Sequence, residues 1–421
     1  MTGRRSRSRP NDQRPAAPFR ALLSRLGLRR VLAAAGFGIA AAGLALALTA
    51  STLIRRGNAD MATRLMPIDG LALAYRAELM LGQDPLHPKP EIARLARAAL
   101  RRQAVNPTAL RVLGIVAITR GDERKGRALI LQAERQSRRD GPTQFWLIED
   151  AVQRGDVRAA LTHYDIVLRN KPSSHALLFP ILLEALNDPA IRGVLGRYFA
   201  TDQIWAPQFA SYALANSKNL DPLVALTMES GGLGNPRLAH DQAVGLIARL
   251  VAENRFAAAR RLYLTMPGAS PARLVDPALD AADLDARFGA MGWQTRAEAD
   301  ASSSLAKDEA GKPSLLLAAN ALTTASVVTK LLYLRPGKYR VHIAFSRLEG
   351  GDGAGVEARV RCPAQTGDRP IWSQRANART IKGDVVLPLG CDVQYLDIVV
   401  SGGSSGSMLD ATIHSVAIRP R

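Results

Sequence analysis

One serine stands in a pattern that some hydrolases use for nucleophilic catalysis. Residues 402–406 read Gly-Gly-Ser-Ser-Gly, which satisfies G-x-S-x-G and follows a strand-forming run. In that motif the serine occupies a sharp turn between a strand and a helix, which exposes its hydroxyl. Residues 407–409 lead instead into another strand-forming run. We therefore interpret Ser404 as a residue of a hairpin loop rather than as a nucleophile.

Other residue types that carry chemistry are sparse and scattered. The six histidines form no H-E-x-x-H pair, and the sequence has neither a P-loop nor a G-x-G-x-x-G motif. Asp283 and Asp285 form an acid pair in an expected linker, where carboxylates are usually just solvated. We therefore expect no enzymatic activity, no cofactor and no metal site.

The only two cysteines of the chain are Cys362 and Cys391. Cys362 ends one expected strand and Cys391 follows another, so a disulfide can join them in an oxidising compartment. Such a bond would contribute about 3–4 kcal/mol on the chain-entropy model. The alternative is two free thiols in the core. Zinc binding is not expected, because the two cysteines lack ligand partners at the spacing of zinc fingers.

The N-terminal part of the chain predicts a membrane anchor. Residues 31–54 form an almost uninterrupted apolar run of 24 residues, long enough to cross the hydrocarbon core of about 30 Å as a helix. Nine arginines precede this run, whereas only Arg55 and Arg56 follow it closely. The positive-inside rule therefore predicts that residues 1–30 form a cytoplasmic tail at a bacterial inner membrane, with the bulk of the chain periplasmic. A cleaved signal peptide is the alternative, but its apolar core spans only about 7–15 residues.

The formal net charge of +19 does not by itself indicate a nucleic-acid partner. Residues 1–56 hold eleven arginines and one acid, so they supply +10 of that charge. The remaining basic residues form no stripe with interleaved aromatic residues, which is the pattern of nucleic-acid binding. The length of 421 residues allows two or three domains.

A repeat of 34 residues marks the middle of the chain. Gly121-Asp122 returns as Gly155-Asp156 after that interval. The period is typical of helix-turn-helix units that bury their apolar faces by stacking on one another. We expect such units across residues 59–270. The residues expected to pack the two clearest units are Leu113, Gly114, Ala117, Gly121, Leu147, Ala151, Gly155, Ala160, Tyr164 and Pro172.

The second of these units, residues 141–174, resembles tetratricopeptide repeats. The similarity is carried by Leu147, Gly155-Asp156, Ala160, Tyr164 and Pro172, whereas Ile148 and Arg138 depart from the family pattern. The resemblance implies a curved solenoid whose concave groove takes protein partners. The alternative is an irregular helical bundle that merely spaces the C-terminal domain from the membrane.

Residues 276–421 predict an all-β sandwich. Short runs with β-branched residues are separated there by Gly, Asp and Pro turns. Apolar residues alternate along residues 339–345, so Arg340 and His342 should point outward. The expected strands cover residues 315–317, 325–334, 339–345, 356–362, 384–387, 395–400 and 411–418.

Three short motifs in this region resemble carbohydrate-binding jelly-roll modules. They are Phe288-Gly289-x-x-Gly292-Trp293, Pro336-Gly337-Lys338-Tyr339 and residues 410–416 of the last expected strand. The resemblance implies exposed aromatic rings that stack on sugars, and the candidates for ligand contact are Trp293 and Trp372. Packing in the core is the alternative for Trp293, whereas Trp372 lies in a polar stretch.

The sequence thus predicts a multidomain protein with one transmembrane helix, an all-α tetratricopeptide-like solenoid and an all-β, jelly-roll-like sandwich. We expect a membrane-anchored periplasmic scaffold for the assembly or export of an envelope polysaccharide. Its expected partners are the inner membrane, proteins held in the repeat groove and an envelope polysaccharide, without nucleic acid. The alternative is a protein-interaction anchor for envelope or division complexes that binds no glycan.

Overall fold

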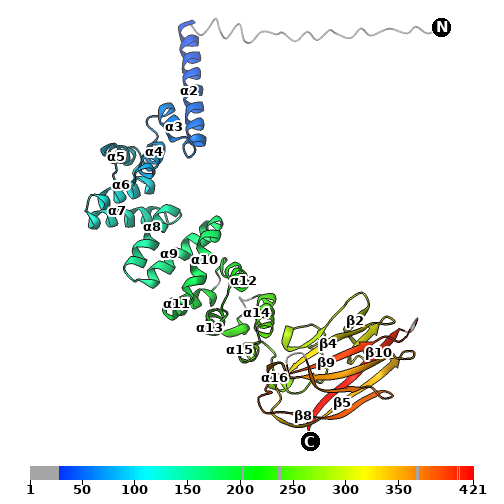
Figure 1. Ribbon diagram of the computed structural model, residues 1–421. Helices are drawn as coiled ribbons and strands as arrows, with labels where there is room; N and C mark the ends of the chain where they lie inside the picture. The colour runs from blue at the N-terminus through cyan, green and yellow to red at the C-terminus, as the bar shows by residue number, and fades with distance from the viewer. Residues whose placement is uncertain (1–27, 202, 236–238, 367–368, 405, 407) are drawn as a thin grey trace, which may run out of the picture. The chain divides into compact units, whose positions relative to one another are not determined.

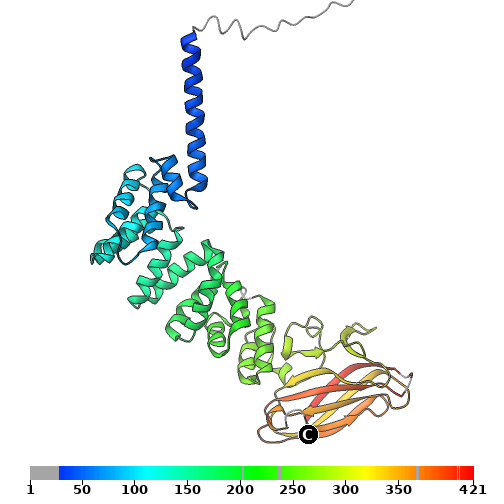
Figure 2. The ribbon, with the colours of Figure 1, turned by 45° about the horizontal axis from the view of Figure 1, so that its top comes forward.

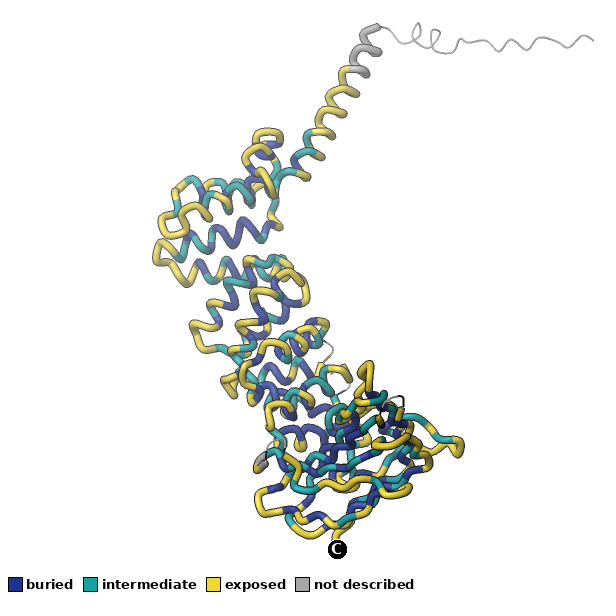
Figure 3. Tube along the Cα trace, turned by 45° about the vertical axis from the view of Figure 1, so that its right-hand side comes forward, coloured by how far each residue is buried: buried dark blue, intermediate teal, exposed yellow. Residues whose placement is uncertain are grey.

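Helix α2 (Leu28–Ile54) forms over the apolar run that predicts a membrane anchor. The computed structural model describes residues 28–421 apart from residues 202, 236–238, 367–368, 405 and 407 (Figure 1), so most of the predicted basic tail, residues 1–30, lies outside the described residues. Residues Gly36–Ile54 are long and apolar enough to cross a membrane, and almost none of their surface is covered by other described residues (Figure 3).

The chain divides into two compact units, Met1–Arg154 and Gly155–Arg421. After α2, the first unit is helical throughout its described part. Most of these helices begin at an Asn or Asp whose side chain accepts a hydrogen bond from a backbone N–H of the first turn, which satisfies a group that the helix itself leaves unpaired. The helices are α3 (Ala59–Leu65), α4 (Gly70–Gln83), α5 (Pro90–Arg102), α6 (Pro107–Thr119), α7 (Glu123–Gln136) and α8 (Gly141–Gln153).

The Gly-Asp pair of the repeat has a definite structural role. Gly121 has a φ of +84° and ends α6, since the left-handed region is open to glycine. Asp122 then caps α7 by accepting a hydrogen bond from the Lys125 N–H at 3.2 Å. The pair at 155–156 repeats this: Gly155 has a φ of +68°, and Asp156 accepts from the Ala159 N–H at 3.0 Å.

Two glycines let α6 and α7 approach each other closely. A Cβ atom at Gly114 would lie 2.5 Å from Ile130 Cγ1 and 2.8 Å from the Gly126 carbonyl oxygen. A Cβ atom at Gly126 would lie 2.6 Å from the Gly114 carbonyl oxygen. The backbones therefore touch at this crossing, and no larger side chain fits without separating the helices.

A buried ion pair joins other helices of the first unit. Arg111 of α6 is only 4% exposed. Its guanidinium lies 2.9 Å from Glu78 of α4 and 2.9 Å from Asp140, the residue that caps α8. Because both carboxylates depend on one buried cation, loss of Arg111 would leave them unpaired in a partly dry environment.

The second unit begins with further helices and ends with the sandwich (Figure 2). Its helical part packs around an aromatic cluster that contains Phe179, Phe199, Trp205 and Phe209. The buried Trp205 indole N–H donates to Asp165 Oδ1 at 2.9 Å. The helices are α9 (Val157–Asn170), α10 (His175–Ala185), α11 (Pro189–Phe199), α12 (Ala206–Asn216), α13 (Asp221–Glu229), α14 (His240–Ala252) and α15 (Phe256–Tyr263).

The remaining residues expected to pack the repeats lie on these helices or at their ends. Leu147, Ala151 and Ala160 are buried, whereas Leu113, Ala117 and Tyr164 are half-buried. Helix α9 ends at Asn170, and the exposed Pro172 follows it. These observations describe helices and local packing, and they do not assign the region to the tetratricopeptide family.

Two five-stranded antiparallel sheets form the sandwich. Sheet A has the strand order β1-β4-β9-β6-β7, and sheet B has the order β2-β3-β10-β5-β8. All connections change sheet except β2 to β3 and β6 to β7, a connectivity that resembles double-sheet jelly rolls. The strands are β1 (Trp293–Thr295), β2 (Ala301–Lys307), β3 (Pro313–Ala319), β4 (Thr324–Leu332), β5 (Gly337–Glu349), β6 (Gly355–Arg361), β7 (Pro370–Arg375), β8 (Thr380–Leu387), β9 (Gln394–Ser401) and β10 (Leu409–Pro420).

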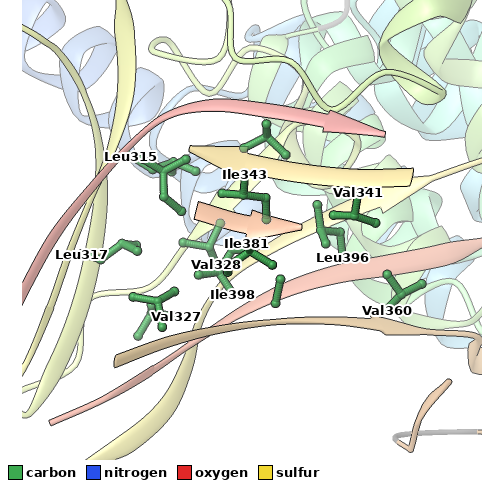
Figure 4. Packing of buried hydrophobic residues seen from close by; sticks show 14 of the residues in the cluster. Leu315, Leu317, Val327, Val328, Val341, Ile343, Val360, Ile381, Leu396 and Ile398 are labelled. Carbon is green, nitrogen blue, oxygen red and sulfur yellow. The ribbon is translucent and has the colours of Figure 1, made fainter. Parts of the chain in front are cut away.

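The sandwich core lies between the two sheets. Val328, Leu396 and Ile398 of sheet A lie in one buried cluster with Val341 and Ile343 of sheet B (Figure 4). The alternation expected along β5 is confirmed, because Tyr339, Val341, Ile343 and Phe345 are buried while Arg340 is exposed and His342 half-exposed. The predicted order of helices followed by an all-β sandwich is therefore confirmed.

We expect alanine to have opposite effects at two helical glycines. Gly114→Ala should lower the free energy of unfolding by about 1–3 kcal/mol, because its methyl group overlaps α7. Gly193→Ala should raise it by up to about 1 kcal/mol, because a Cβ atom meets nothing within 4 Å there and alanine favours helix. Thermal unfolding of the full chain in detergent, followed by circular dichroism, checks both. Equal shifts of the two variants would contradict the close crossing of α6 and α7.

Candidate functional site

The two tryptophans expected to stack on a sugar are both used in packing. Trp293 is 4% exposed and belongs to the sandwich core. Trp372 is half-buried on β7 and packs over Gly383 of β8, where a Cβ atom would lie 2.8 Å from Trp372 Cζ2. The Trp293 ring therefore has little surface open to a ligand, whereas Trp372 keeps part of its surface exposed.

The described residues place Ser404 in a loop and show no metal-binding group. Ser404 lies between β9 and β10, and its backbone N–H donates to the Asp352 carbonyl oxygen at 2.9 Å. A strand rather than a helix follows, as the loop interpretation expects. Over the part of the chain that the structure describes, no three His, Cys, Asp or Glu side chains are grouped so that they could hold a metal ion.

The expected disulfide between Cys362 and Cys391 is present. It connects the end of β6 to the segment before β9, and both residues are fully buried with their Cα atoms 5.7 Å apart. Beside it, the buried amide of Gln394 accepts from the Leu334 N–H at 2.9 Å and donates to the Leu334 carbonyl oxygen at 3.2 Å. It also donates to the Cys391 carbonyl oxygen. The disulfide and this amide together fix the end of the sandwich.

An open cleft of about 840 Å³ lies at that end of the sandwich, next to α15. One wall comes from α15 and from residues 271–276. The opposite wall comes from the turn between β4 and β5, from residues 392–393 and from the end of β10. The polar and aromatic side chains that line it are Arg260, Asp276, Tyr333, Arg335, Tyr339 and Asp392.

Tyr333 holds the two walls of the cleft together. Its N–H donates to the Leu274 carbonyl oxygen at 2.7 Å, and its hydroxyl donates to the Phe256 carbonyl oxygen at 2.9 Å. Burial raises the pKa of the Tyr333 phenol, so the hydroxyl stays protonated and remains a donor. The Arg260 guanidinium lies over the same ring, 5.7 Å from its centroid, in a cation–π contact.

The cleft offers groups that suit a hydroxyl-rich ligand. The guanidinium groups of Arg260 and Arg335 donate hydrogen bonds, while the carboxylates of Asp276 and Asp392 accept them, and all four residues are exposed. The rest of the lining is mostly apolar and includes Val275, Leu334 and Pro420 at its edges. A cleft with this lining can bind a ligand, because a few polar groups fix the orientation of the ligand against the apolar surface.

Buried charges connect sheet A to the segment before β1. Lys330 is 2% exposed, and its ammonium donates to the Met291 carbonyl oxygen at 3.0 Å. Burial lowers the pKa of Lys330 to about 8, and burial also raises the pKa of Asp283, which is 4% exposed. Arg273 lies 3.6 Å from the Asp283 carboxylate. The expectation that Asp283 is solvated is therefore wrong, because this segment folds against the sandwich, whereas Asp285 is exposed.

Sequence reasoning did not find the residues of the cleft. They come from five separate segments between residues 257 and 420, and only Tyr339 belongs to a motif singled out in the sequence, Pro336-Gly337-Lys338-Tyr339. One usable signal was Lys330, a cation inside the apolar run of β4. A charge at such a position predicts a buried partner nearby.

Comparison with known proteins finds no family model and no curated protein sequence that matches this chain. Carbohydrate-binding modules are among the solved structures that resemble it. TmCBM61 in complex with β-1,4-galactotriose is 13% identical with a TM-score of 0.23, over 31% of this chain and 88% of its own. A CBM4 structure is 11% identical with a TM-score of 0.22, over 31% and 88%. The enzymatically active domain of bacteriophage CBA120 tailspike protein 4 is 14% identical with a TM-score of 0.23, over 31% and 19%.

We expect the stability of the sandwich to rise between pH 8 and about pH 10.5 because of Lys330. In this range the unfolded lysine still binds a proton that the folded one has lost, so the free energy of unfolding rises with pH, by about 3 kcal/mol in all. Lys330→Met should remove this rise. Melting temperatures of the full chain, followed by tryptophan fluorescence across this range, check the prediction.

The control for this pH dependence is Lys382→Met, which removes an exposed lysine of β8. It should keep the wild-type pH dependence, because it leaves the buried ammonium of Lys330 in place. Parallel curves for the wild type and Lys330→Met would show that the charge of Lys330 does not limit stability.

Proposed function

We propose that this protein is a membrane-anchored periplasmic scaffold that binds an envelope polysaccharide in the cleft between α15 and the sandwich. The observation that carries this proposal is the cleft itself, with its two tyrosines, two arginines and two aspartates. Sugars present hydroxyl groups around an apolar ring face. Arginine and aspartate side chains can pair with the hydroxyl groups, while the apolar wall covers the ring.

The proposed topology rests on charge and on the disulfide. The arginines before α2 support a cytoplasmic N-terminus, and the bonded Cys362 and Cys391 fit an oxidising compartment on the other side of the membrane. In this arrangement α2 anchors the chain and the cleft lies on the periplasmic side of the inner membrane. Such a position suits the assembly or export of a polysaccharide.

For the helical region we propose a tetratricopeptide-like solenoid that binds proteins. Support comes from the recurring Gly-Asp turn at Gly121 and Gly155 and from the close crossing of α6 and α7 at Gly114. Stacked helical hairpins with such crossings leave an extended surface for partners. The protein would then bring an assembly or export protein to a bound polysaccharide.

Arg260→Ala should weaken binding of glycans by about tenfold or more, because it removes both a hydrogen-bond donor and the cation over the Tyr333 ring. Arg261→Ala is the matched control, since Arg261 is exposed on the same helix and does not line the cleft. A glycan array probed with the full chain in nanodiscs makes the comparison. Failure to bind any glycan, or equal effects of the two variants, would overturn the assignment of the cleft.

A second candidate function is a protein-interaction anchor without glycan binding. One observation favours it: Leu177 and Ile181 of α10 are 59% and 48% exposed and lie one helical turn apart. Adjacent exposed apolar side chains on one helix face are typical of a contact site for a partner.

This second function predicts that Leu177→Asp combined with Ile181→Asp abolishes crosslinking to envelope proteins. Leu389→Asp serves as the control, because Leu389 is an isolated loop residue that is 85% exposed. Crosslinking in intact cells followed by mass spectrometry gives the measurement. The anchor function would be favoured over the glycan scaffold by two results together. The double variant but not the control would lose its crosslinked partners, and the protein would bind no glycan. Unchanged crosslinking would rule out this face of α10.

A further inference from the structure

The outer face of sheet B carries a cluster of cations at one end. Strands β5, β8 and β10 lie side by side in this sheet (Figure 1) and place alternate residues on its solvent side. We call this surface the basic face. It consists of Lys338, Arg340, His342, Lys382, Arg419 and Arg421, with Asp384 as the acidic residue among them.

The strand register places two arginines opposite each other on this face. Arg340 lies opposite Arg419 across β5 and β10, and opposite Asp384 across β5 and β8. Like charges directly opposite in a sheet are destabilising, and rigid strands about 4.8 Å apart cannot spread to separate them. Asp384 offsets the charge of Arg340, whereas Arg419 has no carboxylate beside it within the described residues, so an anionic ligand would offset the remaining repulsion.

The single carboxylate of the basic face does not neutralise it. Asp384 binds Arg340 at 3.0 Å and also Arg421. Within the described residues, Lys338, Lys382 and Arg419 have no carboxylate within ion-pair distance. These three cations project from neighbouring strands and remain open to a ligand.

The outer face of sheet A shows the opposite arrangement. There Arg361 lies 2.5 Å from Asp397, and Arg359 lies 2.9 Å from Glu357. Because these arginines are already paired with carboxylates of the same sheet, they have little to offer to an anion. Arg359 and Arg361 of β6 thus differ from Lys338, Lys382 and Arg419 of the basic face, which have no such partner within the described residues.

The basic face and the cleft lie at the same end of β5 and β10. Tyr339 and Pro420 line the cleft, and their neighbours Lys338 and Arg419 point to the outer side of the same strands. The Arg421 N–H donates to the Lys338 carbonyl oxygen at 3.0 Å, which extends the pairing of β5 and β10 to the end of the chain. A polymer that lies in the cleft would turn around this end of the strands to reach the basic face.

We propose that the basic face binds the carboxylates of an acidic polysaccharide whose chain also enters the cleft. This proposal rests on the proposed glycan-binding function and specifies its substrate class. A regularly charged polysaccharide presents carboxylates at successive sugars, which a row of cations on adjacent strands can contact one after another. The basic face lacks aromatic rings that could stack on nucleic-acid bases, so its side chains favour a glycan over a nucleic acid.

Charge reversal at two sites tests the proposal. Lys338→Glu combined with Lys382→Glu should weaken binding of the full chain in phosphatidylcholine nanodiscs to polygalacturonate by about tenfold or more at low salt. Lys307→Glu combined with Lys312→Glu is the matched control, with the same change in net charge at the β2–β3 hairpin on the opposite edge of sheet B. This control should retain binding within about twofold. Methyl-esterified polygalacturonate, which lacks the negative charges, should bind the wild type less tightly.

The outcomes separate this inference from the glycan-binding function. Equal binding of the charged and the methyl-esterified polymer, or equal loss in both double variants, would overturn the basic face while leaving the cleft as a site for neutral glycans. Binding to phosphatidylglycerol vesicles without binding to polygalacturonate would overturn it in favour of a membrane contact. Absence of binding to every glycan would overturn both the inference and the proposed function.

Discussion

The candidate site depends on the hydrogen bonds that join the sandwich to α15 and its neighbouring segments at the end of β4. The Tyr333 backbone and hydroxyl bind two carbonyl oxygens of the helical part, at Leu274 and Phe256, and Lys330 binds a third at Met291. These are strong bonds because they are sheltered from water, and each would leave a buried polar group unsatisfied if it broke. The cleft lies beside these bonds, between α15 and the sandwich.

Rigidity on the sandwich side of the cleft has a separate origin. The disulfide and the buried amide of Gln394 tie the segment before β9 to β6 and to the turn at Leu334. Pairing of β5 with β8 and β10 also fixes the positions of the cations on the basic face. Cleft and basic face therefore share one scaffold, and a ligand that spans them meets groups whose positions are already set.

Much of the fold could be predicted from local patterns. The apolar run predicted α2, and the Gly-Asp turns predicted helix ends at Gly121 and Gly155. The alternation of apolar and polar residues predicted which side chains of β5 point inward and which point outward. Strands β1, β2 and β7 escaped prediction because they are short or rich in Ala, Ser and Gln, and they lie at or near sheet edges where packing selects residues weakly. Of the two interpretations that the sequence left open for Trp293, the structure shows packing in the sandwich core.

By itself the sequence determined what depends on neighbours along the chain: the membrane-length helix, the helical hairpin turns, the strand alternation and the presence of two cysteines near strand ends. Tertiary structure alone decided which distant residues meet. It placed Arg260 over Tyr333, buried Asp283 near Lys330, and set Arg340 opposite Arg419. These pairings depend on strand register and on how the helices dock against a sheet, and a one-residue change of register would reverse every side chain. Local patterns cannot fix that choice, because it is made by packing the whole core.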